Sequence, residues 1–347
     1  MDSLKHKCEI SFLPSNISTP QVTIVVVPKE RFSYTRPALE SIYENTHIPF
    51  SLVYVDGNSP QKVQQYLQAR AAEKGFRLVR SDRYLAPNQA RNVGLSYVKT
   101  KYVVFVDNDV VFTPGWLNKL VKCAEETEAT VVCPLTCIGE PIHQTVHLVG
   151  GEARIVVEAQ GEQIIRKVHE QHYFVNRPVA EVQELLHRKQ CEFGEFHCLL
   201  ARRDIFARIG LLDEALLSTR EPMDFCLNLT QAGGQIYCEP DSVVTYVPGK
   251  LEWSDLPFFF LRWSDEWELS SLQHFREKWS LTSQDRYIKK CARRLGDRRY
   301  NAFLRPFVRD LSFGQTNTWL ENRLKPLERS FNHYLTRRHK ENLMEAK

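Results

Sequence analysis

The sequence, 347 residues long, has no apolar run that approaches the ~20 residues of a membrane-spanning helix. Its first residues, Met1-Asp-Ser-Leu-Lys-His-Lys-Cys8, contain no apolar core of a secretory signal peptide. Nine scattered cysteines include no Cys-x-x-Cys pair, which argues against both a disulfide framework and a zinc knuckle. We therefore expect a cytoplasmic protein whose thiols are reduced.

Other common sequence features are absent as well. No glycine-rich phosphate loop follows the first apolar run, residues 22–27, which disfavours a nucleotidyltransferase built on such a loop. There are no internal repeats and no low-complexity tract. The composition, with 43% hydrophobic residues, is that of an ordinary globular protein. A chain of this length is expected to form about two to three structural units.

The net charge of +4 is distributed unevenly. From Arg276 onward there are 18 Lys and Arg against 8 Asp and Glu, a balance of +10, so the preceding 275 residues carry −6. This basic stretch follows a segment rich in aromatic residues, 253–279. We expect either a helical surface packed on the rest of the protein or peripheral contact with an anionic membrane. Nucleic acid is not expected as a partner, because no binding motif accompanies the charge.

Apolar runs alternate with segments of helical spacing through the first 135 residues. Strands are predicted at residues 22–27, 51–56, 76–79, 102–106 and 130–133. Helices are predicted at residues 34–45, 87–99 and 114–126, with another ending near residue 74. Strict alternation with short connections predicts the α/β class, with a doubly wound, mostly parallel, Rossmann-like sheet.

The second half of the chain is less regular. Strands are predicted at residues 154–158, 236–238 and 243–246, and helices at residues 178–189, 202–209 and 223–231. Pro248-Gly249 marks a boundary. After it, the spacing of Trp263, Trp267, Leu272 and Phe275 fits one face of a helix and predicts a helical C-terminal extension.

Carboxylates stand at the ends of two predicted strands. Asp56 ends the second strand, and Asp107-Asn108-Asp109 follows the fourth. In open α/β sheets, ligands bind outside the carboxyl ends of the strands. An Asp-x-Asp motif also offers the hard oxygens that suit a divalent cation, and such a cation would bridge phosphates. A polar turn explains this triplet equally well when it is considered alone.

Four motifs in order resemble those of the family 2 glycosyltransferases of GT-A fold, over about residues 21–250. They are the first strand with Pro28 and Glu30, Val53-Tyr-Val-Asp56-Gly-Asn-Ser59, Asn88-Gln-Ala-Arg91-Asn-Val-Gly94, and Asp107-Asn108-Asp109. The resemblance implies that these residues form a nucleotide-sugar site. In it, Glu30 and Asp56 would hold the nucleoside, while Asp109 and Asp107 would bind Mn²⁺ or Mg²⁺. Arg91 would contact phosphate or pair with one of the acids.

The acceptor half departs from the family pattern at two positions. Glu221-Pro-Met-Asp224 stands where the family shows Glu-Asp-x-Asp, so Pro222 replaces the usual base. The family often places a His metal ligand at the end of this unit, and this sequence has Tyr246 there. These departures leave open a catalytically inactive module that binds a nucleotide sugar.

Two pairs of residues are candidates for the chemistry on the acceptor. Glu221 and Asp224 lie three residues apart at a predicted helix start and share a face. We expect Glu221 to act as the base, although acids at a helix start also favour the dipole. Glu195 and His197 alternate on a predicted strand and would point the same way. They are expected to bind the acceptor or act as the base, unless they form a buried pair.

The sequence therefore predicts a metal-dependent, inverting glycosyltransferase that uses a nucleotide-diphosphate sugar, most of all a UDP-sugar. The acceptor would be a glycan, a lipid-linked sugar or a protein. The expected units are an N-terminal arm at 1–20, a nucleotide-sugar-binding half at 21–135, an acceptor-binding half at 136–250, and an aromatic and basic helical region at 251–347. Peripheral contact with the inner membrane face through that last region is an open alternative.

Overall fold

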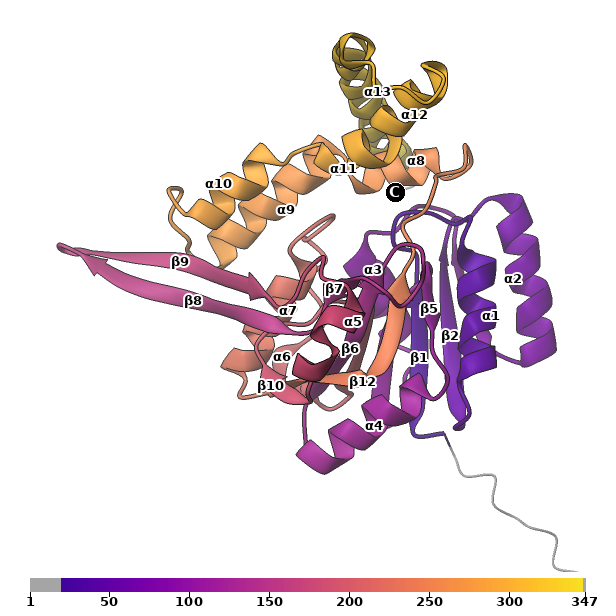
Figure 1. Ribbon diagram of the computed structural model, residues 1–347, viewed down its shortest axis with the longest axis vertical. Helices are drawn as coiled ribbons and strands as arrows, with labels where there is room; N and C mark the ends of the chain where they lie inside the picture. Colours follow the sequence, from indigo (N-terminus) through magenta and orange to yellow (C-terminus); the bar gives the residue numbers. More distant parts are fainter. Residues whose placement is uncertain (1–19, 346–347) are drawn as a thin grey trace, which may run out of the picture.

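Ten strands form the central sheet of the computed structural model, which describes residues 20–345 (Figure 1). They are β1 (Val22–Val27), β2 (Phe50–Gly57), β3 (Arg77–Ser81), β4 (Tyr102–Asp107), β5 (Val110–Phe112), β6 (Val131–Ile138), β7 (Val146–Leu148), β10 (Lys189–Cys191), β11 (Cys198–Arg202) and β12 (Ile236–Tyr246). Their order is β10-β12-β6-β11-β4-β1-β2-β3, with β5 beside β12 and β7 beside β6.

The sheet is mostly parallel, as the alternation of strands and helices predicts. β1 pairs in parallel with β2 and β4, and β12 pairs in parallel with β6. β11 runs antiparallel between β4 and β6. β1 and β4 are buried along their whole length, which explains why both are continuous apolar runs. The predicted α/β class is confirmed.

Helices cover both faces of this sheet, and the alternation along β1 sends its side chains to two separate cores. Ile24 and Val26 pack on one side, with α1 (Thr35–Asn45), α2 (Gln61–Lys74) and α4 (Trp116–Thr127). Val25 and Val27 pack on the other, with α3 (Pro87–Leu95), α6 (Ile205–Ile209) and α7 (Glu221–Gln231). Gly94 of α3 lets this helix approach the sheet, since a Cβ there would lie 2.2 Å from Val25 Cγ1.

For the second half, one prediction was wrong and two strand predictions were correct in kind but too short. The helix expected at 178–189 is only α5 (Val179–Val182) and a 3₁₀ turn, because Val182 is the one buried residue in those two segments. The strand expected at 154–158 is longer and belongs to a hairpin, β8 (Gly151–Gln160) and β9 (Gln163–His172), which protrudes from the body (Figure 1). The two strands expected at 236–246 are one strand with a register shift between Glu239 and Val243.

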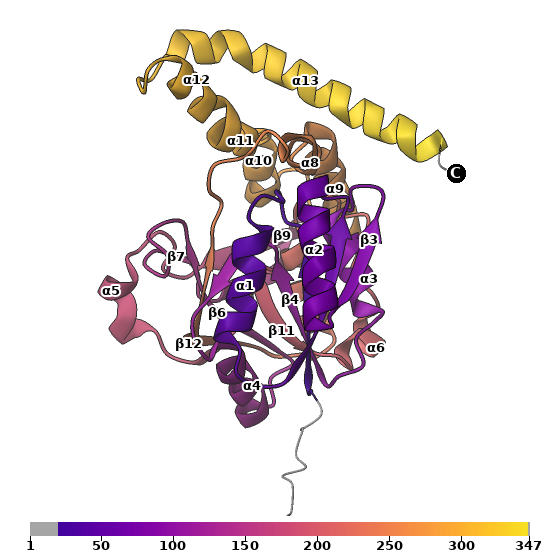
Figure 2. The same cartoon turned by 90° about the vertical axis from the view of Figure 1, so that its right-hand side faces the viewer.

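The C-terminal region is helical and lies above the edge of the sheet where β1, β2 and β4 end (Figures 1 and 2). It comprises α8 (Leu256–Arg262), α9 (Asp265–Lys278), α10 (Arg286–Arg293), α11 (Asp297–Arg299), α12 (Arg305–Leu311) and α13 (Thr318–Glu345). Asp255 joins it to the loop after β1 by accepting hydrogen bonds from the N–H groups of Phe32 and Ser33. Across residues 20–345, no helix is both long and apolar enough to cross a membrane.

Candidate active site

Asp107 ends β4, Asn108 and Asp109 connect it to β5, and all three side chains are buried. The amide of Asn108 holds the loop after β1. Its Oδ1 accepts from the Lys29 N–H at 3.0 Å, and its Nδ2 donates to the Arg31 carbonyl at 2.8 Å. This clamp fixes the direction of the two flanking carboxylates.

Asp107 is surrounded by nitrogen atoms. Arg91 Nη2 lies 3.2 Å from Oδ1, while His197 Nδ1 and Lys29 Nζ lie 3.0 Å and 3.6 Å from Oδ2. Burial opposes ionisation of Asp107, but Lys29, His197 and Arg91 outweigh it and hold its pKa well below the usual range. Asp107 is therefore an anion at neutral pH. Of the two roles expected for Arg91, the structure shows the ion pair with an acid.

Asp109 is in the opposite situation. Neither of its buried carboxylate oxygens has a hydrogen-bond partner in the described part of the chain. Burial, and then the charges of Asp107 and Glu30, raise its pKa well above the usual range. Buried polar groups normally have hydrogen-bond partners, so two buried oxygens without one indicate that a ligand would complete the site.

A divalent cation fits this position. Asp107, Asp109 and His197 each present one ligand atom, and these atoms lie within 4.8 Å of one another. Two carboxylates and an imidazole form a donor set that Mn²⁺ accepts readily, while Mg²⁺ favours the carboxylates. The two predicted metal ligands thus lie together, and the structure adds His197, which the sequence suggested only for the acceptor.

Glu195 and His197 precede β11 on a loop, so the strand expected at this point is wrong, yet the two side chains do meet. Glu195 Oε2 lies 3.6 Å from His197 Nε2 and 3.0 Å from Nε2 of His147, a residue of β7. The His197 ring stacks on Tyr246 with 4.2 Å between the ring centroids. Imidazoles therefore reach the end of β12 from two other segments, although Tyr246 stands where the family often has histidine.

The two acids expected to hold the nucleoside are buried and already bonded within the protein. Asp56 accepts from the Ser59 N–H at 2.8 Å and pairs with Arg80. Glu30, which follows Pro28 and β1, accepts from the Tyr246 hydroxyl at 2.7 Å and the Trp263 indole at 2.8 Å.

Arg298 of α11 also pairs with Glu30. Trp263 and Arg298 therefore bring the C-terminal region directly to the carboxyl edge of the sheet. No local pattern predicts this contact, because it joins residues more than 230 positions apart.

Glu221 and Asp224 share the first turn of α7 and are both buried, but they bind different partners. Glu221 Oε1 lies 3.0 Å from Nη2 of the buried Arg262. Asp224 accepts from the Trp279 indole at 2.9 Å and from Lys278 at 2.8 Å. Both predicted catalytic acids are thus tied to the C-terminal region.

A cavity of about 410 Å³ lies between the acceptor half and the C-terminal region. Its wall includes Glu195, Arg220, Pro222, Trp263, Glu268, Tyr287, Lys290, Arg294 and Arg298. Glu195, which contacts His197, links this cavity to the group of Asp107, Asp109 and His197, which we call the acid cluster. We call it the acceptor-side cavity.

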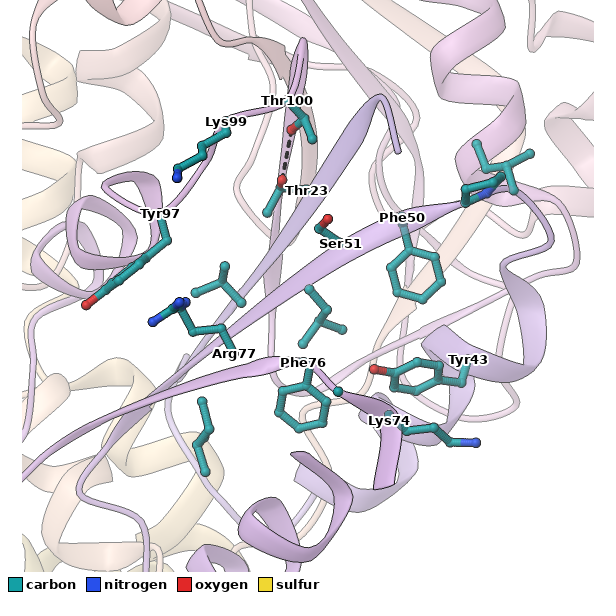
Figure 3. Close-up of a pocket in the computed structure, with 16 residues that line it drawn as sticks. Thr23, Tyr43, Phe50, Ser51, Lys74, Phe76, Arg77, Tyr97, Lys99 and Thr100 are labelled. Atoms are coloured by element: carbon teal, nitrogen blue, oxygen red, sulfur yellow. Dashed lines mark hydrogen bonds between the residues drawn. The ribbon is translucent and has the colours of Figure 1, made fainter. Parts of the chain in front are cut away.

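A larger hollow of about 920 Å³ lies at the opposite edge of the sheet, where β1 and β2 begin. Figure 3 shows it, with the hydrogen bond of 2.8 Å between Thr23 and Thr100 on its wall. No acidic residue lines this hollow. Since ligands of parallel sheets bind at the carboxyl edge, we place the active site at the smaller cavity and the acid cluster.

Residues 23–149 match the family model described as Glycosyl transferase family 2. They include β2 to β7, all of β1 but its first residue, and the three carboxylates Asp56, Asp107 and Asp109. The segment is a family 2 glycosyltransferase domain. The family expected from the sequence motifs is therefore confirmed.

Curated relatives of this family 2 domain agree with the match. Pre-mycofactocin glycosyltransferase of Mycobacterium tuberculosis is 25% identical over 235 residues, which cover 67% of this chain and 44% of the relative. Succinoglycan biosynthesis protein ExoW of Rhizobium meliloti is 24% identical, over 63% of this chain and 67% of the relative. The chain thus spans less than half the length of the first of these relatives.

The fold also matches a solved structure. GalNAc-T7, crystallised with UDP, GalNAc and Mn²⁺, has a TM-score of 0.50 and 16% sequence identity, with 83% of this chain and 59% of that chain covered. This likeness supports the GT-A fold around the family 2 domain.

Proposed function

We propose that this protein is a metal-dependent glycosyltransferase that moves a sugar from a nucleotide-diphosphate donor, a UDP-sugar above all, to an acceptor hydroxyl with inversion. The carrying observation is Asp109: both buried oxygens lack a partner, beside Asp107 and His197, at the carboxyl edge of the sheet. The family 2 domain and the glycosyltransferases among its relatives support the same reaction class.

Each residue of the donor site has a part in this proposal. Asp109, Asp107 and His197 would hold Mn²⁺ or Mg²⁺, and the bound cation would neutralise the leaving diphosphate. Asp56 and Glu30 would accept hydrogen bonds from the nucleoside. Asn108 keeps the loop after β1 in place through its two backbone contacts.

A panel of UDP-sugars, tested with and without Mn²⁺, checks the donor part of the proposal. A donor that binds only the folded state stabilises the protein by about 2.7 kcal/mol when the donor concentration is a hundred times the dissociation constant. The melting temperature should therefore rise when Mn²⁺ and donor are both present. Equal shifts with and without Mn²⁺ would contradict metal dependence. Donor binding without transfer of the sugar to any acceptor, and so without release of UDP, would favour the inactive sugar-nucleotide-binding module, the alternative that Pro222 and Tyr246 support.

We also propose that α13 holds the protein at an anionic membrane surface. Leu327, Phe331 and Tyr334 lie at spacings of four and three on this helix, and each is at least 46% exposed. Arg323, Lys325, Arg329, Arg337 and Arg338 are exposed on the same helix. An amphipathic helix with aromatic and basic side chains is typical of interfacial binding.

A further inference from the structure

Four acidic side chains line the acceptor-side cavity: Glu170, Glu195, Glu268 and Asp297. Two of them have basic partners. Glu195 Oε2 lies 3.0 Å from His147, and Glu170 lies 3.5 Å from His172 and 3.9 Å from Lys290. Asp297 is exposed at the start of α11, where solvent and the helix dipole stabilise its charge.

Glu268 differs from the other three acids. It is partly buried on α9, and its carboxylate has no side-chain hydrogen bond or ion pair in residues 20–345. The neighbouring arginines are engaged elsewhere: Arg262 binds Glu221 and Ser218, and Arg299 binds Asp265 and Glu328. Glu268 therefore lines the cavity with a carboxylate that no other side chain binds, while the backbone N–H of Gly296 lies beside it.

The cavity connects Glu268 with the donor site. Trp263 and Arg298 line the same cavity as Glu268, and both bind Glu30 at the carboxyl edge of the sheet. Glu195 lines the cavity as well and touches His197, a neighbour of Asp107. An acceptor bound in this cavity would thus lie next to Glu268 and next to residues that contact Glu30 and His197.

We propose that Glu268, contributed by the C-terminal region, is the catalytic base of the transfer. This inference rests on the proposed function. The acceptor hydroxyl gives its proton to the Glu268 carboxylate as its oxygen bonds to the anomeric carbon of the donor. The bond from that carbon to the diphosphate oxygen breaks, and UDP leaves with the electron pair.

The electrostatic surroundings suit a base. Burial raises the pKa of Glu268 to about 7, with Asp265 adding to the rise, while Arg299, Arg262 and the Gly296 N–H oppose it. A general base works best when its pKa lies near the operating pH. The cavity is also lined by Lys290 of α10, Arg294 just after α10, Arg298 of α11, Arg220 before α7 and His172 of β9. These positive or titratable groups would shift the apparent pKa of Glu268 in the complex.

The test measures UDP release from UDP-glucose and UDP-GalNAc with Mn²⁺, water serving as the acceptor, over pH 5 to 9. Wild-type kcat should rise with pH about a midpoint near 7. Glu268→Gln should lose that rise and about a hundredfold or more in kcat, while its Kd for UDP stays within twofold. Glu266→Gln is the matched control, since Glu266 lies on the same helix and binds Lys340 instead.

A second variant separates catalysis from structure. Formate added to Glu268→Ala should restore part of the lost rate if a carboxylate is needed as the base, whereas a purely structural loss would not respond. If the wild-type protein turns over and the kcat of Glu268→Gln lies within threefold of the wild-type value, Glu268 is not the base, while the proposed function still stands. Absence of turnover in the wild-type protein with any donor would overturn both.

Discussion

Asp109 lowers the stability of the protein without metal, because its two buried oxygens lack hydrogen-bond partners. An unpaired buried polar group costs about 1–3 kcal/mol. The charges of Asp107 and Glu30 further disfavour an anion at this position. Because Asp109→Asn removes that repulsion, it should keep or raise the melting temperature of the metal-free protein by a few degrees. The same substitution should abolish the shift that Mn²⁺ and UDP produce together.

Asp241→Asn is a suitable control for this experiment, because the Asp241 side chain is exposed and lies outside the candidate active site. An Asp109→Asn protein that still shows the full manganese-dependent shift with UDP would contradict the metal role of Asp109.

Glu221 is predicted by its sequence position to be the base, whereas the structure ties it to Arg262. Removing one partner of a buried ion pair costs about 3–5 kcal/mol, because the other charge is left uncompensated. Glu221→Gln should therefore lower the free energy of unfolding by roughly 3 kcal/mol, measured by urea denaturation.

The double variant Glu221→Gln, Arg262→Met removes both charges and should recover part of that loss. The opposite result is equally clear. If Glu221→Gln keeps its stability and its affinity for UDP but loses about a hundredfold in transfer, Glu221 is the base and Glu268 is not.

Several site residues could be predicted from the sequence because their signal is local. Asp56 and Asp107-Asn108-Asp109 end strands that read as apolar runs, and strand ends meet at one edge of a parallel sheet. Trp263 and Arg298 had no such signal. They reach Glu30 only through the way the C-terminal helices dock on the sheet.

Among the secondary-structure elements, the buried strands were predicted more accurately than the partly exposed ones. The strands β1 and β4 are wholly buried, so both appear in the sequence as continuous apolar runs that predict a strand. The hairpin β8–β9 was largely missed because most of β9 is only partly buried and its residues are mixed polar and apolar. Such strands depend on pairing with each other and on docking, which a single sequence does not display.

That hairpin docks on the C-terminal region through Asp285. One carboxylate oxygen accepts from the Val168 N–H of β9 at 2.7 Å, and the other caps α10 by accepting from the Tyr287 N–H at 2.6 Å. Loss of a cap costs about 1–2 kcal/mol. Asp285→Ala should therefore speed amide hydrogen exchange in both α10 and β9.

Asp285→Asn is the control for that prediction, since an Asn side chain also caps helices and should retain much of the protection. Faster exchange in α10 alone, with β9 unchanged, would show that Asp285 does not join the two elements.

For the molecule as a whole, membrane association through α13 is directly testable. Each basic residue near an anionic leaflet contributes about 1 kcal/mol, and salt screens this gain. The intact protein should pellet with phosphatidylserine vesicles at low salt, less at high salt, and not with phosphatidylcholine vesicles. Leu327→Ser should weaken pelleting, because Leu327 is 64% exposed on α13.

Leu185→Ser provides the matched control, since Leu185 is 59% exposed but lies far from α13 in the sequence and outside the C-terminal region. If the intact protein stays in the supernatant with phosphatidylserine at low salt, the membrane proposal fails. The C-terminal region would then serve the catalytic domain alone, and its buried Phe258, Phe259, Phe260 and Phe275 already make it part of the folded body.

The contacts of Glu30 with Arg298 and Trp263 have a thermodynamic consequence. A nucleoside that recruits Glu30 competes with the C-terminal region for the same carboxylate. Any change in donor affinity on membrane docking must then equal the change in membrane affinity on donor binding, because coupling between two sites is reciprocal. The carboxylate of Glu30 would thus couple the affinity of the protein for its donor to its affinity for the membrane surface.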